Sequence, residues 1–182
     1  GGFCCDQHAM YDPHHDLMFW LSLYLHDGSG NKMVRLAIAS NSHFEASTVD
    51  IDRPGPSYTV DTLADLRARL GPEAELYFIL GYDALRDLPR WKEPARILEM
   101  GHLVAVKRPE YKEFDIAFLD LAVAPGASRK VILIDRPLIG VSASDIRERV
   151  GRGRSVRYWV PDAVEEYIRR HGLYRGSSCV RG

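Results

Sequence analysis

The chain has 182 residues, of which 46% are hydrophobic and 27% charged, and its formal net charge is −1. This composition is ordinary for a globular protein with one hydrophobic core, and two independent domains would each be small. The near-zero charge argues against a general nucleic-acid partner, although residues 147–157 are locally basic. The longest apolar runs are far too short to span a bilayer, so no membrane segment is expected.

The cysteines and the N-terminal sequence bear on the cellular compartment. Cys4, Cys5 and Cys179 form an odd-numbered set without a C-x-x-C spacing, so no disulfide framework is expected. A secretory signal with a cleavage site is not recognisable. We therefore expect a reducing, cytoplasmic compartment.

Elements become predictable only from Met33 onward. Residues 1–32 mix Cys, His, Met and aromatic side chains without sustained helical or strand periodicity, so no elements are predicted there. Residues 33–40 are typical of the end of a buried helix, and residues 47–52 alternate as a half-exposed strand does. The turn sequence 53–58 then leads into a helix that ends at Gly71. One face of this helix carries Val60, Leu63, Leu66 and Leu70.

The second half of the chain alternates strands and helices. Three apolar runs predict buried strands, namely ELYFIL at 75–80, HLVAVKR at 102–108 and KVILID at 130–135. A loop is predicted at 81–91. Three helices are predicted, from Pro94 to Gly101, from Ser142 onward, and from Pro161 to Gly172. The alternation predicts an α/β fold, a Rossmann-like doubly wound parallel sheet in a single domain. The loops after its strands, 81–83, 107–111 and 140–144, should gather at the carboxyl edge, where such sheets bind ligands.

The stretch GVSASDIRERVGRGRS, residues 140–155, has the residue types of a phosphate site. Ser142 and Ser144 open the predicted helix, and Arg147 follows within its first turns. Serine caps free backbone N–H groups, a helix start attracts anions, and arginine has planar donors for phosphate oxygens. Taken alone, these residues favour an ordinary capped helix with a solvated basic face over a phosphate cradle.

Six motifs, in order and with plausible spacing, resemble those of one enzyme family. They are RPGPSYTVDTL, LYFILGYDAL, LPRWKEPARIL, HLVAVKRPEY, VSASDIR and WVPDAVEEYIRRHGLY, within Met33 to Tyr174. This part of the chain resembles the bacterial nicotinate mononucleotide adenylyltransferases, of the nucleotidyltransferase superfamily with an H-x-G-H motif. The resemblance implies transfer of the adenylyl group of ATP to nicotinate mononucleotide, giving deamido-NAD and pyrophosphate, with Mg²⁺ accompanying ATP.

The resemblance also implies roles for individual residues at the pyridine end. Trp91 would stack on the nicotinate ring, and the backbone N–H groups of Thr59 and Lys92 would bind its carboxylate. Without the resemblance, Trp91 would be assigned to the core beside the Pro94 helix, because large aromatic side chains mostly pack.

At the nucleotide end the implied residues follow three strands. Ser142, Ser144 and Arg147 would hold the ATP phosphates, and Arg147 would neutralise charge on the departing pyrophosphate. Gly81 and Asp83 would lie near the ribose and adenine. The alternative for these two is a plain turn with Asp83 as helix N-cap. Arg108 either faces the phosphates or is a solvated charge, and the residues favour neither interpretation.

Residues 1–32 depart from the family pattern. They are too few for the strand, the GGTFDPIHxGH motif, the helix, the second strand and the loop that precede Met33 in the family. In the echo YDPHHDLM, His15 takes the first catalytic histidine position, but Leu17 and Met18 replace the glycine and the second histidine. The predicted organisation is therefore a disrupted segment 1–32, a nucleotidyltransferase domain 33–175 and a disordered tail 176–182.

Three alternatives stay open at this stage. In the first, the chain is a non-catalytic or impaired nucleotide-binding protein of the same fold. In the second, it is a sister adenylyltransferase acting on another phosphate substrate. The third alternative is a zinc site at Cys4, Cys5, His8, His14 and His15, although no structural zinc spacing is present. The acid or amide preference, the metal's identity and the oligomeric state, a homo-oligomer included, are left undecided.

Overall fold

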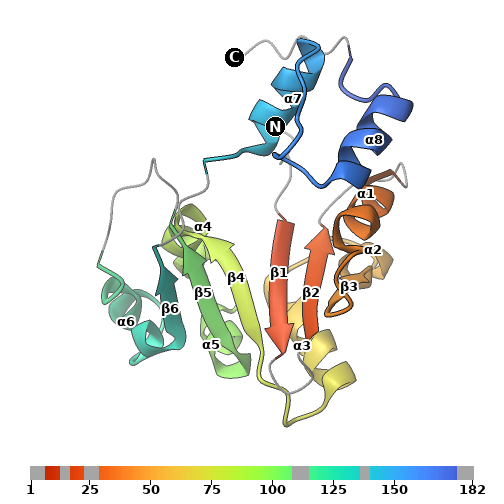
Figure 1. Cartoon of the computed structure of the whole chain (residues 1–182). Helices are drawn as coiled ribbons and strands as arrows, with labels where there is room; N and C mark the ends of the chain where they lie inside the picture. Colours follow the sequence, from red (N-terminus) through yellow and green to blue (C-terminus); the bar gives the residue numbers. More distant parts are fainter. Residues whose placement is uncertain (1–6, 13–16, 23–28, 108–114, 136–139, 176–182) are drawn as a thin grey trace.

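The computed structural model describes residues 7–12, 17–22, 29–107, 115–135 and 140–175. Its strands form one six-stranded sheet in the order β3-β2-β1-β4-β5-β6 (Figure 1). They are β1 Gln7–Asp12, β2 Leu17–Ser22, β3 Phe44–Ser47, β4 Tyr77–Gly81, β5 His102–Val106 and β6 Val131–Ile134. Helices flank the sheet, and the predicted α/β, Rossmann-like fold class is confirmed.

The sheet is parallel except at β1, and this is a difference from the prediction. β2 pairs in parallel with β3, and β4, β5 and β6 pair in parallel with one another. β1 runs antiparallel to both β2 and β4. Only residues 13–16 separate β1 from β2. A parallel crossover needs a dozen or more residues, so this short connection permits only antiparallel pairing of the two strands.

Five of the eight described helices begin or end close to predicted signals, and the other three lie where no helix was predicted. The helices are α1 Ser29–Ile38, α2 Val49–Asp52, α3 Thr59–Leu70, α4 Tyr82–Asp87, α5 Pro94–Met100, α6 Phe118–Ala122, α7 Ala143–Gly151 and α8 Asp162–Arg170, with 3-10 turns η1 Leu88–Arg90 and η2 Ala127–Lys130. α3 ends at Gly71, whose φ of 94° is in the region that favours glycine. α5 begins at Pro94 and ends at Gly101, as predicted.

Two predicted elements are wrong. Residues 47–52 are not a strand, because β3 ends at Ser47 and α2 follows, with the Asp52 N–H donating to the Thr48 carbonyl at 2.9 Å. Residues 81–91 are not a loop but form α4 and η1. Leu85 and Leu88 are fully buried there. Burial of these two side chains stabilises a helical segment that a short sequence pattern does not reveal.

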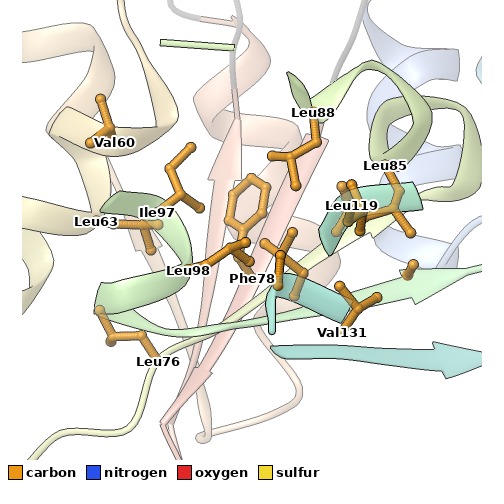
Figure 2. Close-up of a cluster of buried hydrophobic side chains, with 14 of the residues drawn as sticks. Val60, Leu63, Leu76, Phe78, Leu85, Leu88, Ile97, Leu98, Leu119 and Val131 are labelled. Carbon is orange, nitrogen blue, oxygen red and sulfur yellow. The ribbon is translucent and has the colours of Figure 1, made fainter. Parts of the chain in front are cut away.

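The core lies between β4, β5 and the helices that follow the strands. Figure 2 shows Val60 and Leu63 of α3, Ile97 and Leu98 of α5, and Phe78 of β4 within one buried cluster. Burying a side chain of this size contributes about 1.5–3 kcal/mol. Along β4 the burial alternates, with Phe78 buried and Tyr77 half-buried, and in β6 only Val131 is buried. Contrary to the prediction, these two strands are therefore not covered on both faces.

The strand directions place the candidate site. β4, β5 and β6 are parallel, so their carboxyl ends, at Gly81, Val106 and Ile134, lie at one edge of the sheet. Figure 1 shows α7 and α8 on the side toward which the arrows of β4 and β5 point. This arrangement confirms the predicted gathering of strand ends, while residues 108–114 and 136–139 lie outside the described part of the chain.

Candidate functional site

The start of α3 and the segment after η1 lie side by side at the site. The Lys92 Nζ donates to the two carboxylate oxygens of Asp61 at 3.1 and 2.9 Å. The same ammonium group lies 4.7 Å from the centroid of the Tyr58 ring. Tyr58 is the N-cap residue of α3, and Thr59 is its first helical residue. The structure therefore brings the Lys92 side chain to the first turn of α3, which begins at Thr59, although the two segments are far apart in the sequence.

This contact changes the electrostatics expected at the pyridine end. The ammonium charge of Lys92 is paired with Asp61, whose side chain is 32% exposed, so little net charge is left for a substrate. What the site offers is the first turn of α3, a twelve-residue helix whose N-cap makes no side-chain hydrogen bond within the described structure. Such a helix start has backbone N–H groups and partial positive charge directed at an anion. The start of α3, rather than the Lys92 charge, is therefore the feature here that suits an anion.

Trp91 lies directly before Lys92 and contacts the core. Its backbone N–H donates to the Leu88 carbonyl at 3.0 Å, which ends η1. Its ring meets Phe78 edge to face, with centroids 6.2 Å apart and planes at 84°. The side chain is only partly buried against the core cluster. The packing interpretation is thus correct for part of the Trp91 side chain, and a partly exposed indole is also what stacking on a ligand requires.

Asp83 has an unusual environment at the carboxyl end of β4. Gly81 is the N-cap residue of α4, so the alternative with Asp83 as N-cap is wrong. The Oδ1 atom of Asp83 is buried and has no hydrogen-bond partner among the described residues. An unsatisfied buried oxygen costs about 1–3 kcal/mol, more when charged. This acceptor suits a ligand hydroxyl that donates to it.

The start of α7 has the predicted cap. The Ser142 Oγ accepts from the Asp145 N–H at 3.0 Å and donates to the Asp145 carboxylate at 2.7 Å. The Arg147 Nη2 donates to the Ser144 Oγ at 3.1 Å. None of the residues of α7 is buried, although the structure describes the whole helix. The capped, solvated helix is therefore present, and its Ser144 and Arg147 side chains lie together on an exposed face.

The remaining predicted site residues fall outside this geometry. His15 and Arg108 lie outside the described residues. In the antiparallel pairing of β1 with β2, Asp12 lies opposite Leu17 and Tyr11 lies opposite Met18. On its other side, Tyr11 lies opposite Tyr77 of β4, so Leu17 and Met18 are at the same end of the sheet as Tyr77. Tyr77 begins β4, so Leu17 and Met18 lie at the sheet edge opposite Gly81. The positions compared with the glycine and second histidine of the motif are thus not brought to the candidate site.

Sequence reasoning missed the partners of Lys92 and the polar network around Arg53. Asp61 is 31 positions from Lys92, and no local pattern connects them.

Within the described ranges, no group of three or more His, Cys, Asp or Glu side chains is arranged to hold a metal ion. Of the proposed zinc ligands, Cys4, Cys5, His14 and His15 lie outside these ranges. No described helix is long and apolar enough to cross a membrane.

An α/β sheet with helix starts at its carboxyl edge belongs to the doubly wound class, whose members bind ligands at that edge. Residues 31–149 match the model of the cytidylyltransferase-like family, and the chain belongs to that family. A Thermomicrobium roseum protein named "Probable nicotinate-nucleotide adenylyltransferase" is 52% identical over 143 residues, covering 79% of this chain and 65% of that protein. A Thermus thermophilus protein of the same name is 50% identical over 144 residues, 79% of this chain and 71% of that one.

These relatives place the chain among the nicotinate-nucleotide adenylyltransferases, as the motifs predicted, and it spans 65–71% of their length. A solved structure adds a likeness of fold. The nicotinic acid mononucleotide adenylyltransferase of Plasmodium falciparum, complexed with APC, aligns with a TM-score of 0.56 at 21% identity. The alignment covers 75% of this chain and 70% of that one.

Proposed function

We propose that this chain transfers the adenylyl group of ATP to nicotinate mononucleotide, a step of NAD biosynthesis. A phosphate oxygen of the mononucleotide forms a bond to the α-phosphorus of ATP, and the bond from that phosphorus to the bridging oxygen of pyrophosphate breaks. Deamido-NAD and pyrophosphate leave. The observation that carries the proposal is the contact of Lys92 with Asp61 and Tyr58, which unites the two motifs assigned to the pyridine end. The identity of 50–52% to named adenylyltransferases supports it independently.

At the pyridine end, we assign the nicotinate carboxylate to the start of α3. The N–H groups of Thr59 and Lys92 would donate to it, aided by the partial positive charge of the helix start. Trp91 would stack on the ring with the part of its indole that the core leaves exposed. A neutral amide gains less from such donors, because hydrogen bonds to a charged group are stronger.

At the nucleotide end, the Oδ1 atom of Asp83 would accept from a ribose hydroxyl, which satisfies a buried oxygen. Ser142, Ser144 and Arg147 would bind the phosphates, and Arg147 would neutralise charge on the departing pyrophosphate. Because the Ser142 Oγ is bonded to Asp145, that pair must open for Ser142 to reach a phosphate. Arg108 would face the ATP phosphates, which is one of the two interpretations its sequence allows. The catalytic role predicted for His15 is not carried into this proposal, because Leu17, two positions further on, lies at the end of the sheet opposite the candidate site.

Mg²⁺ is part of the proposal as a partner of ATP. The described residues have no cluster of three acidic or imidazole side chains for a protein-built site. Mg²⁺ in proteins commonly keeps several waters and binds through substrate phosphates, which is where we propose it here. When bound there, the ion neutralises phosphate charge. We place the reaction in the cytoplasm, with ATP and the mononucleotide as its small-molecule partners.

A pyrophosphate-release assay with ATP, Mg²⁺ and nicotinate mononucleotide tests the function. Release should require the mononucleotide and should be faster with the acid than with nicotinamide mononucleotide. Arg147→Ala should lower the rate by about 10²–10³-fold, as loss of one preorganised donor does. Arg154→Ala removes the same charge beyond the end of α7 and is the control. Faster release with the amide would instead support a sister enzyme.

One observation favours a second candidate, a nucleotide-binding protein that turns over slowly. Leu17 and Met18 occupy the positions of a glycine and a histidine in the family motif, and their strand end lies opposite the candidate site. This candidate predicts binding of both substrates, measured by calorimetry, without rapid pyrophosphate release. The protein used must have its mass and N-terminal sequence confirmed, so that the assay reports on residues 1–32 as written.

A further inference from the structure

Arg53 is the centre of a polar network that the proposed chemistry does not use. Its Nη1 donates to the Asp50 Oδ1 at 3.3 Å and lies 3.4 Å from the Thr62 Oγ1. Its Nη2 donates to the Asp65 carboxylate. The Thr62 hydroxyl donates to the same Asp50 oxygen. With these contacts the guanidinium is committed to protein groups, and it is not a candidate for touching substrate.

The network joins three segments that meet at the start of α3. Asp50 lies in α2, Arg53 begins the turn 53–58, and Thr62 and Asp65 lie in the first two turns of α3. Ser57 closes the other end of the turn, because its hydroxyl donates to the Asp50 carbonyl at 2.8 Å. The turn is therefore attached to Asp50 at both of its ends.

The turn determines where α3 begins. It leads directly to Tyr58, whose carbonyl accepts from the N–H groups of Asp61 and Thr62 at 3.0 and 3.1 Å. The N-cap makes no side-chain hydrogen bond in the described structure, so a cap does not fix this start. The interactions of Arg53 supply the constraint that a capping side chain supplies at other helices.

Burial strengthens the contact of Arg53 with Asp50, whereas Asp65 is 53% exposed. The side chains of Arg53 and Asp50 are 18% and 10% exposed. Burial lowers the pKa of Arg53, but the hydrogen bond and charge of Asp65, with the charge of Asp50, outweigh it, so its pKa is raised. Removing the guanidinium would leave Asp50 with one partner fewer in a place poorly reached by water, which is costly.

We propose that Arg53 is a positioning residue for the substrate carboxylate: through Asp50, Thr62 and Asp65 it sets the orientation of the first turn of α3. The inference rests on the proposed function, because it assumes that Thr59 donates its N–H to that carboxylate. Loss of Arg53 should therefore weaken binding of the acid mononucleotide and reduce discrimination against the amide. ATP, whose proposed contacts lie beyond β4 and in α7, should bind as before.

The test compares Arg53→Met with a matched control, Arg67→Met. Arg67 lies on the same helix and also makes several hydrogen bonds, but at the other end, to the carbonyls of Pro72, Ala74 and Met100. Calorimetry should show that Arg53→Met weakens nicotinate mononucleotide binding by about tenfold or more, the scale of one lost hydrogen bond to a charged group. Binding of ATP and of nicotinamide mononucleotide should stay within about twofold. Arg53→Lys keeps the charge but loses the planar group that donates to Asp50 and Asp65 at the same time. Its affinity for nicotinate mononucleotide should lie between those of the unmodified chain and Arg53→Met.

The control separates positioning from stability. Arg67→Met should lower the melting temperature but keep the ratio of acid to amide affinity. In ligand-free protein, the amides of Asp61 and Thr62 should exchange with solvent faster in Arg53→Met than in Arg67→Met. Equal exchange in the two variants, or parallel losses of mononucleotide and ATP affinity, would overturn the inference. If the unmodified chain binds no mononucleotide, the proposed function fails as well; if Arg53→Met binds it as well as the unmodified chain does, only the role of Arg53 fails.

Discussion

Replacing Trp91 with alanine separates the two roles that the structure allows for this side chain. As a stacking surface for the pyridine ring, the indole should contribute about 1–3 kcal/mol, the range measured for bases on aromatic side chains. Trp91→Ala should therefore weaken nicotinate mononucleotide binding by roughly 5- to 150-fold, since about 1.4 kcal/mol is a factor of ten. ATP affinity should change little, because no proposed ATP contact involves Trp91.

Trp91→Ala should also lower stability, and the geometry bounds the loss. An edge-to-face pair such as Trp91 with Phe78 contributes about 0.5–1.5 kcal/mol beyond its buried area. Because Trp91 is only partly buried, the total should stay below the roughly 3–5 kcal/mol typical of a buried tryptophan. Most domains have a free energy of unfolding of about 5–15 kcal/mol, so the variant should fold.

Calorimetric titration with each ligand, together with urea unfolding, measures both quantities. Trp91→Phe is the matched variant, because it keeps an aromatic ring beside Phe78 with less surface for stacking. Equal losses of affinity for the mononucleotide and for ATP would refute the stacking role. So would unchanged mononucleotide affinity in a destabilised protein, and Trp91 would then be a core side chain only.

Three further predictions follow from particular contacts. A Cβ on Gly101 would lie 2.5 Å from the Leu76 carbonyl oxygen, so Gly101→Ala should lower the free energy of unfolding in urea by about 1–3 kcal/mol. Asp83→Asn removes the charge of a half-buried carboxylate whose Oδ1 atom has no partner among the described residues, so it should raise the free energy of unfolding by about 1 kcal/mol while weakening ATP binding. Thermal unfolding with and without ATP would show both effects. The backbone N–H and the hydroxyl of Ser128 lower the pKa of Asp120. This stabilisation should be present above the unfolded-state pKa of about 3.9 and be lost as pH falls through the folded-state pKa. Urea unfolding at neutral and acidic pH should show that the free energy of unfolding falls less on acidification in Ser128→Ala than in the unmodified chain.

The predicted element boundaries that proved correct depend on short-range chemistry. Gly71 ends α3, Pro94 begins α5, and Ser142 caps α7 through the Asp145 N–H three positions on. Glycine conformational freedom, proline at a helix start and serine capping all act within one turn of chain. A sequence displays such signals directly.

The wrong predictions occurred where burial decides the local conformation. The apolar positions of 47–52 alternate as in a strand, but they belong to the end of β3 and to α2. The segment 81–91 resembles a loop, but complete burial of Leu85 and Leu88 accompanies its helical form. Which of these side chains face the core depends on elements elsewhere in the chain, and a short sequence window does not contain that information.

The sequence by itself determined the family, the α/β class, the helix boundaries marked by glycine, proline or serine, and the set of candidate residues, because motifs and helix signals lie within a few positions of each other. Only the tertiary structure decided which candidates have partners. It paired Lys92 with Asp61 across 31 positions, tied Arg53 to Asp65 and left an oxygen of Asp83 buried without a partner among the described residues. It also set β1 antiparallel to both of its neighbours. Such contacts form because packing of the whole chain brings distant groups into low-dielectric surroundings, where a polar atom that lacks a partner is destabilising.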